Sequence, residues 1–206
     1  MLHSPDLRES LSWVICEIHH KGWATGTGGN FSAVLNRQPL QLLMAPSGVD
    51  KGLVQPTDLI EVNAQAEVTQ GEGRSSAETL LHLAIVEETG AGAVLHTHSV
   101  FNTLLSEHYL AQGQLTLSGY EMLKGLEGIH THQAQVSIPV LPNSQDMPKL
   151  SNEVRRMLGQ TQAHGFLLAG HGLYVWGETL FHARRHLEIL EFLFELTYRK
   201  LTIAPY

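Results

Sequence analysis

The sequence predicts a single α/β domain in which helices cover a sheet, and three observations favour this fold class. Short apolar runs recur between glycine-rich or polar turns, as buried strands do, with 93–95 and 165–169 as examples. Segments near both ends of the chain repeat apolar residues at spacings of three and four, as amphipathic helices do. No internal repeat, low-complexity segment or linker divides the 206 residues. We therefore expect one domain spanning 1–206.

The composition narrows the classes of partner and compartment. A formal net charge of −7 and the lack of a basic run argue against nucleic-acid binding. No apolar stretch reaches the roughly 18 residues that a membrane span needs, so we expect no membrane partner. Cys16 is the only cysteine, which excludes an internal disulfide and fits a reducing compartment. The first residues lack the basic and then apolar layout of a signal peptide, and we expect the protein in the cytoplasm.

The first predicted element is a helix. Ser4 and Pro5 are typical of a helix start, with Ser4 as the cap and Pro5 at the first helical position. Apolar residues then share one face as far as Ile18, and Gly22 suits the carboxyl-terminal cap. The next predicted elements are strands at 31–35, 40–44 and 59–62, followed by a polar hairpin.

Three loops rich in small residues lie between these elements, at 25–30, 45–52 and 72–78. Glycines let backbone amides approach an anion, and Ser75 or Ser76 would cap the next helix, where anions bind well. Two interpretations stay open, namely flexible turns or the walls of one phosphate pocket. The first loop is neither a Walker loop nor a dinucleotide fingerprint, because it has no lysine and no strand precedes its glycines.

Residues 90–99, Gly-Ala-Gly-Ala-Val-Leu-His-Thr-His-Ser, form the central stretch of the chain. A buried strand at 93–95 leads into His96 and His98, and residues two apart on a strand point to the same face. Two such imidazoles can hold one divalent metal, and a catalytic zinc has about three protein ligands and an open position. A pair of hydrogen-bonded histidines at a strand end is the alternative. Ser99 is predicted to cap the helix that follows.

Glu121 lies in a mostly apolar segment beside Lys124. It is either a solvated surface group or a partly buried carboxylate whose raised pKa suits proton transfer, and the pattern alone favours the surface. A second His-Thr-His, at 130–132, has no apolar strand before it. We expect a turn with solvated histidines there.

The last third of the chain predicts four elements before the final helix: a strand at 136–140, a helix at 146–159 and strands at 165–169 and 173–177. Gly170, His171 and Gly172 separate the last two strands. The glycines permit a tight bend and a close backbone approach, which makes His171 a third candidate ligand, with a plain hairpin turn as the alternative. The final helix, 178–201, has a wide apolar stripe, which indicates either deep burial or contact with another subunit.

The order of these motifs resembles the class II aldolase/adducin family, and the match runs over nearly the whole chain. The motifs that carry it are Gly29-Asn30, Ser47-Gly48, Ser75-Ser76, His96-x-His98 and Gly170-His171-Gly172. The resemblance implies a three-layer α/β/α fold with a central, mainly antiparallel sheet, and commonly a homotetramer. It also implies one Zn²⁺ per subunit, held by His96, His98 and His171.

The resemblance further implies a small sugar-phosphate substrate. Its phosphate would sit among Gly29, Asn30, Ser47, Gly48, Ser75 and Ser76. Residues 120–125, Tyr-Glu-Met-Leu-Lys-Gly, are similar to a segment of the family's dehydratases, which implies that Glu121 is the catalytic acid/base of a zinc-dependent loss of water.

Two alternatives accompany this expectation. Aldolases of the family transfer protons with a carboxylate near the position of Glu78, so a sugar-phosphate aldolase remains the second candidate, with Glu78 as a secondary acid/base. Adducin-like members are structural proteins that lack the metal histidines. This chain has all three, which favours an enzyme.

Overall fold

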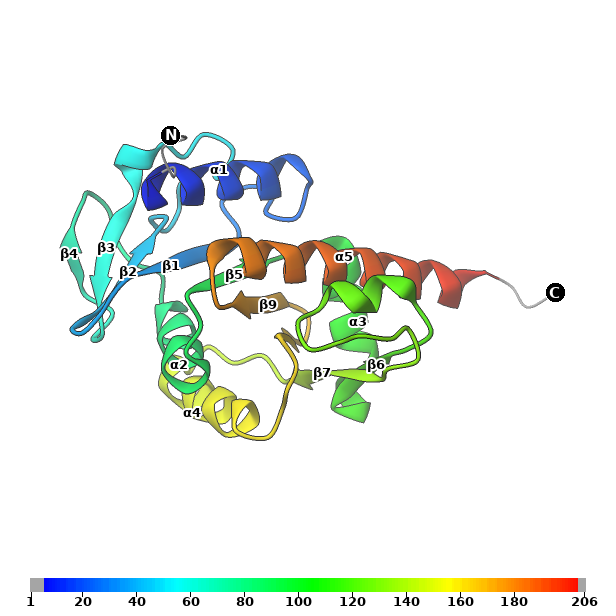
Figure 1. Cartoon of the computed structure of the whole chain (residues 1–206). Helices are drawn as coiled ribbons and strands as arrows, with labels where there is room; N and C mark the ends of the chain where they lie inside the picture. The colour runs from blue at the N-terminus through cyan, green and yellow to red at the C-terminus, as the bar shows by residue number, and fades with distance from the viewer. Residues whose placement is uncertain (1–5, 204–206) are drawn as a thin grey trace.

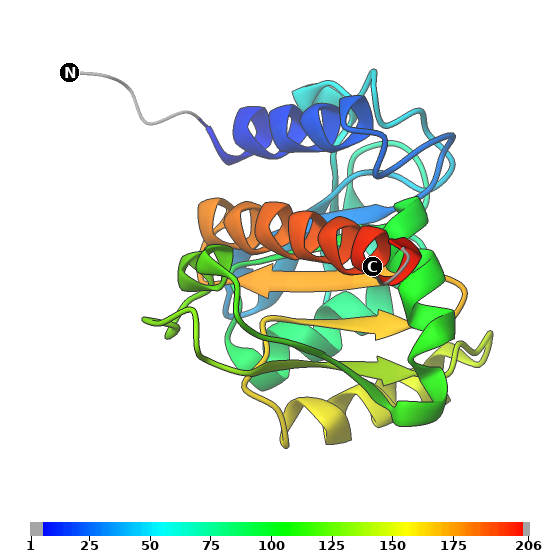
Figure 2. The same cartoon turned by 90° about the vertical axis from the view of Figure 1, so that its right-hand side faces the viewer.

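A computed structural model describes residues 6–203, and a mixed sheet runs through its centre (Figures 1 and 2). The strands are β1 (Asn30–Arg37), β2 (Leu40–Met44), β3 (Ile60–Asn63), β4 (Val68–Gln70), β5 (Ala93–Thr97), β6 (Gln114–Leu117), β7 (Val136–Leu141), β8 (Gly165–Leu168) and β9 (Gly172–Gly177). Their order in the sheet is β4-β3-β2-β1-β5-β9-β8-β7-β6. Neighbours pair antiparallel except β7 and β8, which run parallel, so the sheet is mainly antiparallel as predicted.

Helices cover both faces of this sheet. They are α1 (Leu7–His20), α2 (Thr79–Thr89), α3 (Val100–His108), α4 (Met147–Leu158) and α5 (Leu180–Thr202), with short 3₁₀ turns η1 (Pro56–Asp58), η2 (Leu110–Gln112) and η3 (Glu121–Gly125). Figure 1 shows α1 and α5 above the sheet and α2 and α4 below it, and α3 packs against α5. The three-layer α/β/α fold is therefore confirmed.

Each face of the sheet buries its own hydrophobic core. On the α5 side, Leu11 and Ile15 of α1 pack in one cluster with Leu187 and Phe194 of α5. On the other side, α2 and α4 pack against strand residues that include Tyr174. Burial of this apolar surface is the main term that stabilises the layers, at roughly 25 cal/mol per Å².

Local signals placed some helix ends well and others poorly. Ser99 caps α3 as predicted, since its hydroxyl accepts a hydrogen bond from the Asn102 amide at 3.2 Å. The helix start predicted at Ser4 and Pro5 lies outside the described residues, and α1 begins at Leu7 with the Asp6 side chain as its cap. At the other end of that helix, Gly22 has a φ of +76° and directly follows the cap residue Lys21.

The cap predicted for the second helix is wrong. That helix, α2, begins at Thr79 with Glu78 as its N-cap residue. A turn intervenes, in which the Thr79 amide donates to the Ser76 carbonyl at 3.0 Å. Ser76 therefore holds the turn before the helix, and the side chain next to the helix start is a carboxylate.

Deep burial accounts for most of the apolar stripe on α5. Leu187, Leu190 and Leu193 are fully buried, whereas Phe181 and Phe192 stay exposed. Within residues 6–203, none of the helices combines the length and the apolar character needed to cross a bilayer.

Candidate metal centre and active site

The register of three neighbouring strands places Asn30, His96 and Tyr174 in one row. Asn30 of β1 lies opposite His96 of β5, and His96 lies opposite Tyr174 of β9. Paired residues in antiparallel strands project to the same face, so these three side chains meet. The His96 ring is fully buried and stacks on the Tyr174 ring, with centroids 3.9 Å apart.

Glycines bring the other two histidines to this row. A Cβ on Gly28 would lie 2.9 Å from Nδ1 of His98, so the absent side chain makes room for that ring. Gly170 has a φ of +63°, which closes the bend before His171. A Cβ on Gly172 would lie 2.1 Å from the Thr97 carbonyl oxygen. The tight bend and close approach predicted for this turn are thus both present.

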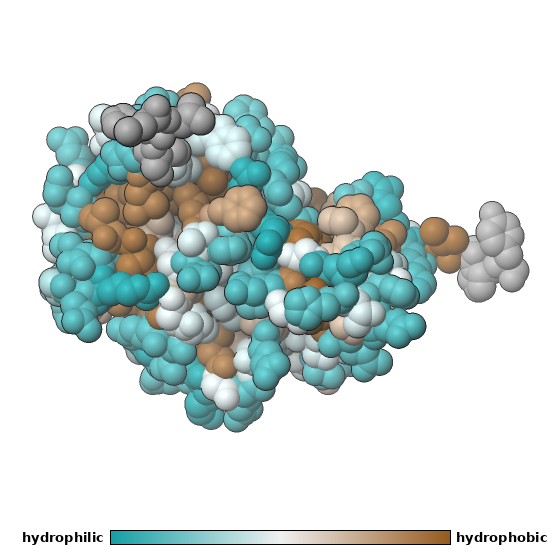
Figure 3. All heavy atoms as spheres, viewed as in Figure 1, coloured by the Kyte–Doolittle hydropathy of each residue, from teal (hydrophilic) through white to brown (hydrophobic). Residues whose placement is uncertain are grey.

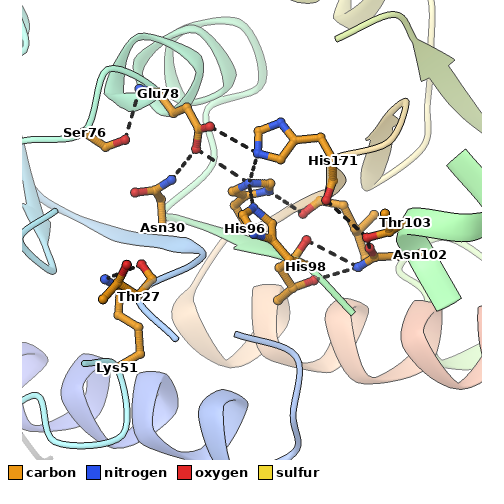
Figure 4. Close-up of polar contacts among 12 residues, drawn as sticks. Thr27, Asn30, Lys51, Ser76, Glu78, His96, His98, Asn102, Thr103 and His171 are labelled. Atoms are coloured by element: carbon orange, nitrogen blue, oxygen red, sulfur yellow. Dashed lines mark hydrogen bonds and ion pairs between the residues drawn. The ribbon is translucent and has the colours of Figure 1, made fainter. Parts of the chain in front are cut away.

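The three imidazoles converge through their Nε2 atoms, as Figure 4 shows. Nε2 of His96 lies 2.7 Å from that of His98 and 3.3 Å from that of His171. Nδ1 of His96 donates to the Leu173 carbonyl at 3.0 Å, which leaves its Nε2 with a free lone pair. A backbone carbonyl that fixes the tautomer in this way is the usual support of a metal-ligating histidine. The donor set therefore fits a divalent metal such as zinc.

Glu78 joins the same cluster from the start of α2. Its Oε1 lies 3.2 Å from Nε2 of His171 and its Oε2 lies 3.6 Å from Nε2 of His96. The Asn30 amide donates to Oε2 and so orients the carboxylate. The structure thus brings the ambiguous carboxylate of the sequence analysis against two of the three candidate ligands.

The electrostatics of the cluster match what a metal requires. Burial favours the neutral form of Glu78, but the hydrogen bond with His171 and the electrostatic attraction of the His96 and His171 rings lower the pKa of Glu78 to about 2. Burial, with the charge of His171 adding to it, lowers the pKa of His98 to about 4. At neutral pH the cluster offers an unprotonated His98 imidazole and an ionised carboxylate. Metal ligands must be deprotonated in this way.

The three small-residue loops meet beside the histidines. Gly29 has a φ of +79°, and a Cβ on it would lie 2.8 Å from the His96 carbonyl oxygen. The Ser47 amide donates to the Arg74 carbonyl at 2.9 Å, which joins the second loop to the third. Ser76 accepts from the Glu78 amide at 3.2 Å. The loops therefore form one continuous wall next to the cluster.

The remaining phosphate candidates differ in their surroundings. Gly48 has a φ of +79° and open space around its Cα. The Ser75 hydroxyl donates to the Ala66 carbonyl at 2.9 Å and so also supports the β3–β4 hairpin. Phosphate binding by these residues stays a prediction.

Lys51 is a buried cation among these loops, and the sequence analysis did not single it out. It is 1% exposed, and its Nζ donates to the carbonyls of Thr27, Pro46 and Val49 at 3.2–3.4 Å. Burial lowers its pKa. Lys51 therefore ties the first loop to the second, beneath Asn30 in the view of Figure 4.

Glu121 lies on η3 and is 71% exposed. Its described contacts are with Lys124 and His132, and the Lys124 ammonium lowers the pKa of Glu121. No contact among the described residues joins Glu121 to the three histidines. His130 and His132 belong to the solvated turn that the sequence predicts, and His132 is exposed.

A second histidine and glutamate group lies between β9 and η3, and the sequence analysis did not predict it. Nδ1 of His186 donates to the Trp176 carbonyl at 2.8 Å, and its Nε2 accepts from the Glu127 amide. The His164 and His186 rings stack, with centroids 4.2 Å apart. Because both His186 nitrogens and Nε2 of His164 hydrogen-bond to the backbone, we assign this group to structure.

Comparison with known proteins shows the family to which the chain belongs. Residues 10–198 match the family model described as Class II Aldolase and Adducin N-terminal domain. The chain is 39% identical over 207 residues to the methylthioribulose-1-phosphate dehydratase of Picosynechococcus sp., covering 99% of this chain and 97% of that protein. It is 42% identical to the methylthioribulose-1-phosphate dehydratase of Methylococcus capsulatus, over 88% of each chain.

A solved structure shares the fold. The L-fuculose-1-phosphate aldolase of Thermus thermophilus aligns with a TM-score of 0.73 and 25% identity, covering 93% of this chain and 94% of that one. The family model covers residues 10–198, which is nearly all of the described chain. This chain belongs to the class II aldolase and adducin family.

Proposed function

We propose that this chain is a cytoplasmic, zinc-dependent lyase that removes water from 5-methylthioribulose 1-phosphate to give 2,3-diketo-5-methylthiopentyl 1-phosphate, a step of methionine salvage. The observation that carries the proposal is the convergence of His96, His98 and His171 beside the three small-residue loops. The two dehydratases to which the chain is 39% and 42% identical carry the corresponding name.

Two regions of the site would bind the two ends of the substrate. The loops that contain Asn30, Ser47 and Ser76 offer backbone amides and hydroxyls for the phosphate, which is remote from the bonds that change. Holding that end fixes the orientation of the sugar, and well-oriented reactants gain several kcal/mol of barrier reduction. Lys51 adds positive charge behind the loops.

The three histidines would hold the metal, which supplies Lewis-acid polarisation of the substrate ketone when bound. A carboxylate must then take the proton from the carbon next to that ketone and return a proton to the departing hydroxide, so that water leaves and every carbon is kept. We assign this work to Glu121. Glu78 lies against the metal histidines, where its negative charge supports them.

Among the described residues Glu121 contacts Lys124 and His132 and none of the three histidines, so we place it in the site of another copy of the chain. We therefore include a homotetramer in the proposal. Exposed apolar side chains supply surface for such an assembly, among them Trp13 at 52% and Phe181 at 63% exposure. They line a groove between α1 and the start of α5, and Figure 3 shows brown, hydrophobic atoms gathered below α1 on this face.

Product analysis tests the reaction. Purified protein loaded with Zn²⁺ and given 5-methylthioribulose 1-phosphate should release a diketone phosphate that retains every carbon. A sugar-phosphate aldolase is the second candidate, because Glu78 lies 3.2 Å from His171, as a proton-transferring carboxylate of that enzyme class would. Formation of dihydroxyacetone phosphate from fuculose or rhamnulose 1-phosphate, without diketone formation, would favour the aldolase.

Subunit mixing tests the shared site. Glu121→Gln and His98→Ala should each be inactive alone. Mixed by unfolding and refolding together, they should regain activity, because some sites then combine an intact Glu121 with an intact histidine cluster. A mixture that stays inactive while both variants assemble normally would show that Glu121 does not act in the site of another copy, and an active Glu121→Gln protein would place Glu121 outside the mechanism.

A further inference from the structure

The residue between two of the candidate ligands faces away from them. Side chains alternate along a strand, so Thr97 points to the face opposite to His96 and His98. There it is fully buried, and its hydroxyl donates to Oε1 of Glu191 on α5 at 2.8 Å. Holding Thr97 therefore holds the backbone from which both imidazoles project.

Glu191 accepts hydrogen bonds from three side chains of this segment. Besides Thr97, the Ser99 hydroxyl donates to its Oε2 at 2.6 Å and the Asn102 amide donates to its Oε1 at 2.9 Å. Asn102 is itself fully buried and also lies 3.1 Å from the Thr97 hydroxyl. Glu191 is only 2% exposed, although it stands among apolar neighbours in the sequence of α5.

The helix that carries Asn102 also holds the turn with the third histidine. The Thr103 hydroxyl donates to the His171 carbonyl at 3.2 Å, and the Gly170 amide donates to the Ser106 hydroxyl at 3.0 Å. Figure 4 shows Asn102 and Thr103 between the His98 and His171 segments. The short helix α3 thus connects the two chain segments that supply the ligands. More than 70 residues separate these segments in the sequence.

The burial of the Glu191 carboxylate on α5 calls for a physical explanation. Burying an ionisable group is unfavourable, and an apolar side chain in a well-packed core is often as stable or more so. Fully satisfied polar networks, in contrast, hold a unique arrangement. In this protein the network stands directly behind the ligand-bearing strand end, where a unique arrangement matters most.

We infer that Glu191 is a positioning residue for the metal centre, which it fixes through Thr97, Ser99 and Asn102 from the opposite face of the sheet. The inference rests on the metal site of the proposed function. Outer partners of metal ligands typically contribute 10- to 100-fold to metal affinity. We assign a contribution of that size to a residue that contacts neither the metal nor the substrate.

The test measures metal binding and not activity. Wild type, Glu191→Leu and Glu191→Gln are stripped with a chelator and titrated with Co²⁺, whose visible absorption reports the ligand geometry, and with Zn²⁺ against a competing dye. Glu191→Leu should weaken Zn²⁺ binding about 10- to 100-fold and alter the Co²⁺ spectrum. Glu191→Gln keeps the shape and one carbonyl acceptor, and it should recover part of the loss.

Leu190→Ala is the matched control, because Leu190 is equally buried on α5 but faces Gly165 of β8. It should lower the melting temperature and leave both metal titrations unchanged. If Glu191→Leu does not fold, Thr97→Val removes the central contact while keeping the side-chain shape, and it should weaken Zn²⁺ binding in the same direction.

Either variant binding Zn²⁺ within about threefold of wild type, with only a lower melting temperature, would overturn the inference and leave the proposed function intact. A wild-type protein that takes up Co²⁺ no better than His98→Ala would overturn the metal centre itself.

Discussion

Oε1 of Glu78 lies 3.2 Å from Nε2 of His171, although 93 positions separate the two residues in the chain. Glu78 is the N-cap residue of α2, and His171 is the turn residue between β8 and β9. The contact joins the helix layer to the sheet at the point where the small-residue loops meet. It also places the Glu78 carboxylate next to the candidate ligands. Glu78 is therefore the alternative to Glu121 for the catalytic role.

Two single substitutions separate the roles of these carboxylates. Glu121→Gln should lower the rate of diketone formation by about 10²- to 10⁴-fold, the usual contribution of a general acid/base. Glu78→Gln keeps an oxygen toward the histidines and should lose less, about 10-fold, because it removes a supporting charge and not the proton carrier. Rates come from a direct product assay at saturating Zn²⁺.

Glu195→Gln serves as the control, since Glu195 is an exposed carboxylate paired with Arg199 on the outer part of α5. It should leave the rate unchanged. A larger loss for Glu78→Gln than for Glu121→Gln would transfer the acid/base role to Glu78 and would favour the aldolase.

Metal binding should depend on His96, His98 and His171. It should not depend on the second His-Thr-His tripeptide, at 130–132. His98→Ala removes one of three converging nitrogens, so the purified protein should hold less than about one tenth of the zinc of wild type. Added Zn²⁺ should then no longer raise its melting temperature, because a ligand stabilises only the state that binds it. His132→Ala changes the exposed tripeptide and should keep full zinc content, as measured by atomic emission. Equal zinc in both variants would contradict the assigned ligands.

The sequence predicted the candidate ligands separately, within each segment of the chain. Alternation along the strand is enough to place His96 and His98 on one face, and the flanking glycines are enough to mark His171. Their meeting depends on the pairing of β5 with β9, which sets His96 against Tyr174. Strand register between distant segments is a tertiary property, and only the resemblance to a family joined the three residues beforehand.

For other parts of the site, the sequence features that could have predicted them were weaker. Glu191 stands in the apolar stripe of α5, which marks it as unusual, but nothing in the helix period says that Thr97 lies opposite. Ser75 and Ser76 look like caps, yet a turn intervenes and Glu78 takes the N-cap position. The preference for serine as a helix cap is a local effect of about 1 kcal/mol. The contacts of Glu78 with His96 and His171 join distant segments of the chain, so the local sequence does not predict them.

Acid should destabilise the metal-free protein through a histidine that lies apart from the ligands. His82 is fully buried, with Nδ1 2.7 Å from the Ser32 hydroxyl, and burial lowers its pKa to about 4. An unfolded histidine has a pKa near 6.5, so between about pH 6.5 and 4 the unfolded chain binds more protons. The free energy of unfolding must then fall as the pH falls through this window, by up to about 3 kcal/mol from His82.

Urea titrations of chelator-treated protein at several pH values measure this slope. His82→Gln cannot titrate and should reduce the slope between pH 6.5 and 4, while the slope that remains comes from other histidines with a lowered pKa, such as His98. His108→Gln, at an exposed position on α3, should leave the profile unchanged. Identical slopes for His82→Gln and wild type would show that His82 is not held neutral by burial.

Gly172→Ala tests the close approach that seats His171. The added Cβ would lie 2.1 Å from the Thr97 carbonyl oxygen, a backbone atom that cannot rotate away. The β5–β9 pairing must therefore separate, at a cost of about 3 kcal/mol, the upper end of ordinary overpacking. The same separation moves His171 from the other two histidines, so the variant should lose zinc even under conditions where it remains folded.

Gly159→Ala is the matched control, because Gly159 has a φ of −66° and its Cβ would find its nearest neighbour at 3.7 Å. That change should alter the free energy of unfolding by less than about 0.5 kcal/mol and leave zinc content at the wild-type level. Zinc retained at full stoichiometry in a folded Gly172→Ala protein would show that the third ligand does not depend on this approach of the two strands.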